Sequence, residues 1–289
     1  MTYRIAKPGE IIVEAQERYP GSFYDKVSSS KYMDEFYKKA VEASGVVKLI
    51  ESREDTVRVV DVAGGRGRVG EMIRKMTDKN FEYIVVDISR KEMGDDKDKV
   101  KIVGDMAHIP LKNSSADVVF FLNMPVPISL IKRKAETMTP GSLVEVEELW
   151  SIKMYLGNSI DAAFRSNMLE GLRVLKPDGV LVTGAKHVGQ SKEVAEEAFR
   201  EFPLRVEKQE VVELDSKVIP LWRKYGLGLE DPKFVITTYR RVEGNVESLI
   251  EHEKERLERN LGKAMEMETF WKVMEEFRKE KWVPEEFSE

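Results

Sequence analysis

Glycines cluster in one short stretch of the chain, from Val57 to Ile73, which reads VRVVDVAGGRGRVGEMI. Gly65, Gly67 and Gly70 have the spacing G-x-G-x-x-G, directly after a β-branched run. Glycines at such a place let the backbone turn tightly and let a ligand approach the backbone N–H groups at the start of a helix. The spacing alone is a weak signal, because it occurs in sites for several nucleotide-like ligands.

The acidic residues around this loop discriminate between those ligands. Asp61 ends the strand before the loop, where a carboxylate is unfavourable beside the two phosphates of NAD or FAD. Asp87 ends the next strand, twenty positions after Gly67, and a carboxylate there can accept both hydroxyls of a ribose, a contact that by itself also suits NAD. Asp105 ends the third strand and can accept from an adenine amino group. S-adenosylmethionine has a ribose, an adenine and positive charge but no phosphate, so it suits all three acids. The alternative is that each aspartate only caps the helix that follows it.

The order of these motifs resembles that of class I S-adenosylmethionine-dependent methyltransferases. VVDVAGGRG resembles motif I, closest to the ubiquinone/menaquinone biosynthesis type, with Ala63 in place of the usual first glycine. VVDIS resembles the second motif, GDMAHIPLKNSSADVVFF the adenine-binding stretch, and LRVLKPDGVLV the segment before strand five, so that the resemblance covers residues 55–186. Arg66 and Arg68 depart from it, because family loops usually hold small or uncharged residues there. The cofactor-binding residues that the resemblance implies are Asp61, Ala63, Gly64, Gly65, Gly67, Asp87, Ile88, Asp105, Met106 and Asn123.

Two residues are candidates for chemistry at the methyl acceptor. His187 lies just past the fifth strand, at the carboxyl edge of the sheet, and is a candidate general base; a plain loop histidine is the alternative. Asn123 opens NMPVP after the fourth strand, which weakly resembles the Asn/Asp-Pro-Pro-aromatic motif of amino-group methyltransferases. Pro125 matches that motif, whereas Met124 and Val126 do not. Asn123 can orient a substrate or line the sulfonium pocket.

These motifs favour a methyltransferase that moves a methyl group to a small-molecule acceptor by direct displacement. Such a displacement can be accelerated by alignment alone, so no catalytic triad is required. Two alternatives stay open: an RNA or protein N-methyltransferase, and a non-catalytic cofactor-binding partner subunit. The sequence does not distinguish O-, N- and C-methylation.

Strands alternate with helices over the central part of the chain, which predicts an α/β fold with a Rossmann-like, mostly parallel sheet and helices on both faces. The resemblance implies seven strands, the last of them antiparallel. We expect the strands at residues 57–62, 81–87, 100–105, 116–123, 179–185, 204–214 and 233–241.

Three regions are expected along the chain. They are an N-terminal helical cap (1–54), a methyltransferase core (55–241) and a C-terminal helical extension (242–289). Within the core, residues 125–158 are longer than a crossover requires and carry Trp150, so we expect them to close over the site as a substrate lid; static packing is the alternative. An apolar stripe in the C-terminal extension indicates packing or a homodimer contact.

Composition excludes some kinds of site. The chain has no cysteine, which excludes disulfides, thiolate metal ligands and cysteine nucleophiles, and we expect no metal site. A net charge of -5 does not favour nucleic acid as a partner but leaves room for a local basic patch. We find neither a signal-peptide-like segment nor the roughly 20 apolar residues that a membrane span needs, and expect a cytoplasmic protein. Scarce glutamine beside abundant lysine and glutamate suggests a thermophilic source.

Overall fold

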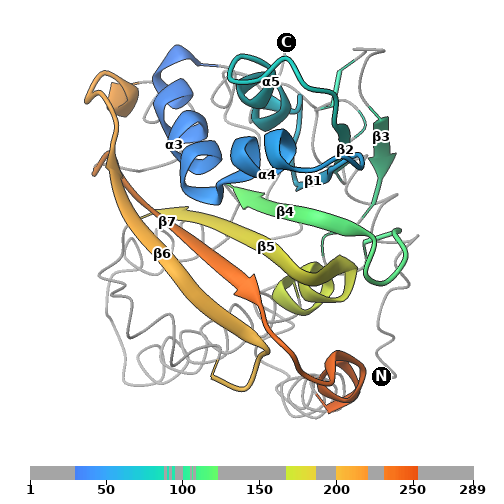
Figure 1. Ribbon diagram of the computed structural model, residues 1–289. Helices are drawn as coiled ribbons and strands as arrows, with labels where there is room; N and C mark the ends of the chain where they lie inside the picture. The colour runs from blue at the N-terminus through green and yellow to red at the C-terminus, as the bar shows by residue number, and fades with distance from the viewer. Residues whose placement is uncertain are drawn as a thin grey trace, which may run out of the picture. The chain divides into compact units, whose positions relative to one another are not determined.

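The computed structural model describes residues 30–87, 90, 93–94, 100–104, 106, 109–122, 167–186, 200–220 and 231–252. Within these ranges the chain forms a seven-stranded sheet with the order β3-β2-β1-β4-β5-β7-β6 (Figure 1). The strands are β1 (Arg58–Val62), β2 (Glu82–Asp87), β3 (Val100–Val103), β4 (Ala116–Leu122), β5 (Leu175–Lys186), β6 (Leu204–Glu213) and β7 (Lys233–Arg241). β1 to β5 are parallel, and β7 runs antiparallel to both β5 and β6. The predicted α/β sheet with an antiparallel last strand is confirmed.

The burial of each strand follows its place in the sheet. β4 lies in the middle, all of its residues are buried, and its sequence ADVVFFL is almost continuously apolar, as expected for a parallel strand covered on both faces. β3 and β6 form the two edges, and the exposed valines Val100, Val103 and Val211 lie on them. The core therefore runs along β2, β1, β4, β5 and β7, and the first four of these strands lead to the candidate site.

β5 begins earlier than the sequence predicts. Leu175 already pairs with Ala116, and the register then shifts so that Val180 pairs with Val118. The extra residues form an irregularity in which Asp178 has a φ of 59°, a left-handed conformation that aspartate tolerates better than most residues. The preceding helix accordingly ends at residue 174 in the part of it that is described, residues 167–174.

The N-terminal residues that the structure describes form helices packed on the sheet. They are η1 (Lys31–Met33), α3 (Asp34–Ser44) and α4 (Val46–Ser52), and α3 ends at Gly45, whose φ of 66° suits glycine. The ring of Phe36, in α3, lies against Gly184 so closely that a β-carbon on Gly184 would come within 2.6 Å of it. The centroid of the Phe36 ring is 4.8 Å from that of Phe234. α3 therefore covers β5 and β7 through close contact at a glycine (Figure 1).

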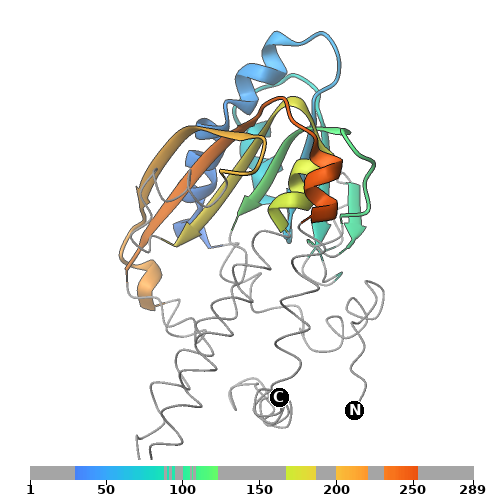
Figure 2. The ribbon, with the colours of Figure 1, turned by 90° about the horizontal axis from the view of Figure 1, so that it is seen from below.

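Helices cover both faces of the sheet, as predicted. Leu122 lies beside Gly184 on the face that α3 covers. The neighbouring Phe121 points to the opposite face, where a β-carbon on Gly171 of helix 167–174 would come within 2.5 Å of its ring. α5 (Arg68–Arg74) contacts α3, and Figures 1 and 2 show the sheet between these helices and helix 167–174.

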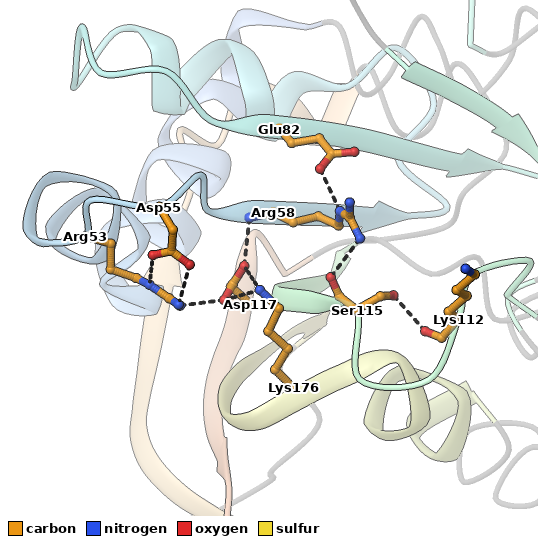
Figure 3. Close-up of polar contacts among 8 residues, drawn as sticks. All are labelled: Arg53, Asp55, Arg58, Glu82, Lys112, Ser115, Asp117 and Lys176. Carbon is orange, nitrogen blue, oxygen red and sulfur yellow. Dashed lines mark hydrogen bonds and ion pairs between the residues drawn. The ribbon is translucent and has the colours of Figure 1, made fainter.

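A buried carboxylate joins three elements at the amino ends of the strands (Figure 3). Asp117 has a side chain that is 3% exposed, and it accepts from Arg53 at 2.6 Å and from Lys176 at 2.9 Å. The backbone N–H of Arg58 donates to it at 2.9 Å. Since this network lies at the strand ends opposite the glycine loop, we assign it to the stability of the fold and not to the site.

The chain divides into two compact units. One comprises Ile5–Pro125 and Ser166–Leu249 and contains the sheet; the other comprises Met1–Arg4, Val126–Arg165 and Ile250–Glu289. The expected lid, residues 125–158, lies outside the described residues. Across the described ranges, no helix has the length and apolar character to cross a membrane.

Candidate functional site

The loop after β1 is held in an unusual backbone conformation. Ala63, Gly65 and Gly67 have φ angles of 55°, 48° and 76°, all in the left-handed region. Glycine adopts this conformation readily, whereas alanine does so at a cost of about 1–2 kcal/mol. The N–H of Ala63 donates to the carbonyl of Val86 at 2.7 Å, and that of Gly67 donates to the carbonyl of Gly64 at 2.8 Å. The positive φ of Ala63 explains why a glycine would be the easier residue at this position.

The Asp61 carboxylate lies directly beneath this loop. The residue is 2% exposed, and a β-carbon on Gly64 would come within 2.6 Å of its carboxyl carbon. The hydroxyl of Tyr83, on β2, donates to Asp61 Oδ2 at 2.5 Å. A buried carboxylate requires such donors, because burial without them disfavours its charged form. Only a glycine at position 64 lets the loop approach the carboxylate this closely.

Asp87 connects the end of β2 to the same loop. The N–H of Gly65 donates to Asp87 Oδ2 at 2.9 Å, and Asp87 is 8% exposed. The side chains of Asp61 and Asp87 lie on the same face of the sheet, because Asp61 pairs with Val85, two residues before Asp87. Two of the three predicted strand-end acids are thus brought together beneath the glycine loop.

Tyr83 links the strand, the loop and the following helix. A β-carbon on Gly70, in α5, would come within 2.5 Å of the Tyr83 ring, so the third glycine of the motif is needed for close packing of helix on strand. Burial raises the pKa of the Tyr83 hydroxyl well above 10, and the charge of Asp61 acts in the same direction. The hydroxyl is therefore protonated at physiological pH and serves as a permanent donor. No sequence pattern indicates this role, because a tyrosine in a strand is ordinary.

We expect Gly70→Ala to destabilise the fold by about 1–3 kcal/mol, because the added methyl group must displace the buried Tyr83 ring or shift α5. Urea denaturation of the variant and the wild type measures this difference. Gly45→Ala is an informative comparison, because there a β-carbon meets nothing within 4 Å and only the left-handed φ of 66° opposes it. A Gly70→Ala variant as stable as the wild type would contradict the packing argument.

Arg68 connects the loop to α3. It forms ion pairs with Asp34 of α3 and, at 2.7 Å, with Glu71 of its own helix, and its side chain is 19% exposed. Its Nε is buried without a hydrogen-bond partner among the described residues. This arginine, which departs from the family pattern, therefore joins two helices. Arg66 is exposed on the same loop.

The remaining predicted site residues are described only in part. Met106 lies in a turn and is half-buried. The residues that fall outside the described part of the chain are Ile88, Asp105, Asn123 and His187. The neighbouring Gly104 is described: its N–H donates to the carbonyl of Asp87 at 3.0 Å, and a β-carbon there would come within 2.8 Å of Pro110. The ends of β2 and β3 are thereby held together where Asp105 follows.

The chemistry of this arrangement favours a cationic ligand with hydroxyl groups. The buried Asp61 carboxylate beneath the loop disfavours a pyrophosphate, and the nearby cation Arg68 is already paired with Asp34 and Glu71. A carboxylate has about four lone-pair sites, so Asp87 can accept from a ribose while it also holds Gly65. Among the described residues, no group of three or more acidic or histidine side chains can hold a metal ion.

Comparisons with known proteins identify the fold. No protein-family model matches the sequence, and neither does any curated protein. A chain from Haloferax volcanii, from a structure described as the complex between the Trm112 methyltransferase activator and the putative methyltransferase, is 15% identical to this one. The match covers 80% of this chain and 99% of that chain, with a TM-score of 0.50. A SAM-dependent methyltransferase from Leishmania major is 14% identical over 79% of this chain and 81% of that one, with a TM-score of 0.47. A loganic acid methyltransferase solved with SAH is 12% identical over 81% of this chain and 98% of that one, with a TM-score of 0.46. The Haloferax chain shares the α/β fold described above.

Proposed function

We propose that this protein is an S-adenosylmethionine-dependent methyltransferase that acts on a small-molecule acceptor by direct displacement. The observation that carries the proposal is the pair of buried acids, Asp61 and Asp87, at the ends of adjacent parallel strands beneath a glycine loop. In open α/β sheets, ligands bind outside the carboxyl ends of the strands. The likeness in fold to the Haloferax chain supports the same assignment.

The described residues fit this cofactor. Asp87 would accept the ribose hydroxyls while keeping its bond to Gly65. Asp61 would provide negative charge near the positively charged part of the cofactor, and the close approach of Gly64 to Asp61 leaves no room for a side chain between them. Ala63 and Gly67 would shape the loop. We also propose that Met106 and the undescribed residues Ile88, Asp105 and Asn123 contact the cofactor, as the resemblance implies.

The cofactor, when bound, supplies a methyl group on a sulfonium, which is already a good leaving group. The protein then has to hold the acceptor in line with that methyl group and to exclude water. We propose His187 as the general base for a hydroxyl or amine acceptor, Asn123 as an orienting residue, and residues 125–158 as the lid. A general base contributes roughly 10²–10⁴ in rate.

A small-molecule acceptor agrees with the net charge of -5, which does not favour nucleic acid as a substrate. The alternatives are methylation of RNA or protein and a non-catalytic partner role. The Haloferax structure is described as an activator in complex with a putative methyltransferase, so an activator subunit is a partner to test here if the isolated chain binds the cofactor without turnover.

Titration calorimetry tests the cofactor assignment. We expect S-adenosylmethionine and S-adenosylhomocysteine to bind, and NAD and FAD to bind far more weakly, because the Asp61 carboxylate opposes the pyrophosphate. NAD binding as tight as that of S-adenosylmethionine would overturn the assignment.

Methyl transfer into an extract of the source cells identifies the acceptor class. The extract is incubated with the protein and radiolabelled cofactor and then fractionated into RNA, protein, lipid and small molecules. Label among the small molecules supports the proposal, whereas label in RNA or protein supports the corresponding alternative. Cofactor binding without label in any fraction would favour the partner role.

A further inference from the structure

The hydrogen bond from Tyr83 to Asp61 affects how well the site binds a positively charged ligand. Asp61 is 2% exposed and Tyr83 is 3% exposed, so neither group is hydrated to a useful extent. In a buried position a carboxylate keeps its charge only where donors and nearby positive charge stabilise it. The Tyr83 hydroxyl is such a donor, at 2.5 Å from Oδ2.

The position of this tyrosine is fixed from several sides. Its ring packs against Gly70 of α5, and the ring of Phe81 lies edge-on to it with centroids 6.3 Å apart. The Arg74 guanidinium lies 5.9 Å from the ring centroid. Since the ring is held by α5 and β2, the hydroxyl has little freedom to turn away from Asp61.

We propose that Tyr83 is a positioning residue that keeps the Asp61 carboxylate charged and directed beneath the glycine loop, and that it thereby sets the affinity for the cationic part of the cofactor. This inference rests on the proposed function. Tyr83 itself touches neither the cofactor nor the acceptor; it acts through Asp61. Without its hydroxyl, Asp61 remains buried but loses a donor, so its charged form becomes less stable.

Other charged groups surround the pair. Glu71 of α5 acts on the Tyr83 hydroxyl through its charge, and the guanidinium of Arg74 lies over the ring. Asp87 lies on the same face of β2 and is held to the loop through Gly65. On β4, the residue paired with Asp61 is Phe120, which is uncharged. Two of the three charged neighbours are carboxylates, and their repulsion also favours protonation of Asp61 once the donor is lost.

The test uses Tyr83→Phe and two ligands over a range of pH. S-adenosylmethionine carries positive charge, whereas 5′-methylthioadenosine has the same ribose and adenine without that charge. In the wild type we expect the ratio of the two affinities to change little between about pH 5.5 and 7, where the α-amino group of S-adenosylmethionine stays protonated. In Tyr83→Phe the affinity for S-adenosylmethionine should be lower than in the wild type and should fall further as the pH decreases, because protonation removes the charge of Asp61, while the affinity for 5′-methylthioadenosine stays constant.

Tyr239→Phe is the matched control. Tyr239 is also a buried tyrosine, its pKa is raised to about 12 by burial, and it lies on β7, away from the loop. We expect this variant to keep the wild-type ratio at each pH. A Tyr83→Phe variant that binds both ligands as the wild type does, or weakens both equally at every pH, would overturn the inference and leave the proposed function intact.

A second variant covers the case in which Tyr83→Phe does not fold. Asp61→Asn keeps the size of the side chain and removes its charge, so we expect at least tenfold weaker binding of S-adenosylmethionine at every pH and unchanged binding of 5′-methylthioadenosine. Unchanged S-adenosylmethionine affinity in Asp61→Asn would overturn the inference. A wild-type protein that binds neither ligand would overturn the proposed function, and the inference with it.

Discussion

Replacing Asp87 with alanine is expected to weaken S-adenosylmethionine binding by about 2–4 kcal/mol, a rise in Kd of roughly 30- to 1,000-fold. The reason is that this carboxylate has two tasks. It would accept the ribose hydroxyls, and it already accepts the N–H of Gly65 at 2.9 Å. The variant therefore loses contacts with the ligand and the bond that holds the loop. Titration calorimetry on the wild type and the variant measures the difference.

Glu82→Ala is a suitable control for Asp87→Ala. Glu82 is a carboxylate on the same strand, β2, but at its opposite end, where it pairs with Arg58 at 2.7 Å and is 37% exposed. We expect unchanged cofactor affinity in this variant. Equal affinity in the wild type and Asp87→Ala would remove Asp87 from the cofactor site. A loss confined to ligands that carry the ribose hydroxyls, with 2′-deoxy analogues unaffected, would assign the effect to the ribose contact and not to the loop.

The fold could be predicted from the sequence because its signals are local and agree with one another. β4 reads as a continuous apolar run, and Gly65 and Gly67 follow a β-branched strand. Strand ends carrying Asp61 and Asp87 then meet at one edge of a parallel sheet. The start of β5 was the exception, because the irregularity at Asp178 depends on pairing with Ala116, far away in sequence.

The internal contacts of the site could not be predicted. The bond from Tyr83 to Asp61 depends on which face of β2 the tyrosine occupies and on the closeness of α5 at Gly70. The pairing of Arg68 with Asp34 joins α5 to α3, which are separated in sequence by α4 and β1. Neither contact follows from a motif, since both arise from tertiary packing. Such contacts explain why the loop takes one conformation, whereas the motif indicates only that a loop is present.

The second large effect concerns stability. We expect Asp117→Ala to lower the free energy of unfolding by about 3 kcal/mol, and the melting temperature by roughly 6–12 °C, without loss of cofactor affinity per folded molecule. The carboxylate is 3% exposed and joins Arg53 of the segment before β1 to Lys176 of β5 (Figure 3). Its removal leaves the N–H of Arg58 without that acceptor. Chemical denaturation followed by circular dichroism measures the loss.

The size of this effect follows from the exposure of the partners. Removing one member of a fully buried ion pair costs about 3–5 kcal/mol, but Arg53 and Lys176 are 36% and 33% exposed and can be hydrated again. Asp55 supplies the control, because it also pairs with Arg53, at 2.8 Å, but its side chain is 61% exposed. Asp55→Ala should leave the melting temperature unchanged within error. Equal destabilisation by both variants would mean that the ion pair with Arg53 governs stability. An Asp117→Ala variant as stable as the wild type would show that the cost of desolvating this carboxylate offsets the contacts that it makes. We expect a large loss of stability in Asp117→Ala and a negligible loss in Asp55→Ala. This order requires the buried Asp117 carboxylate to hold the amino ends of β1, β4 and β5 together.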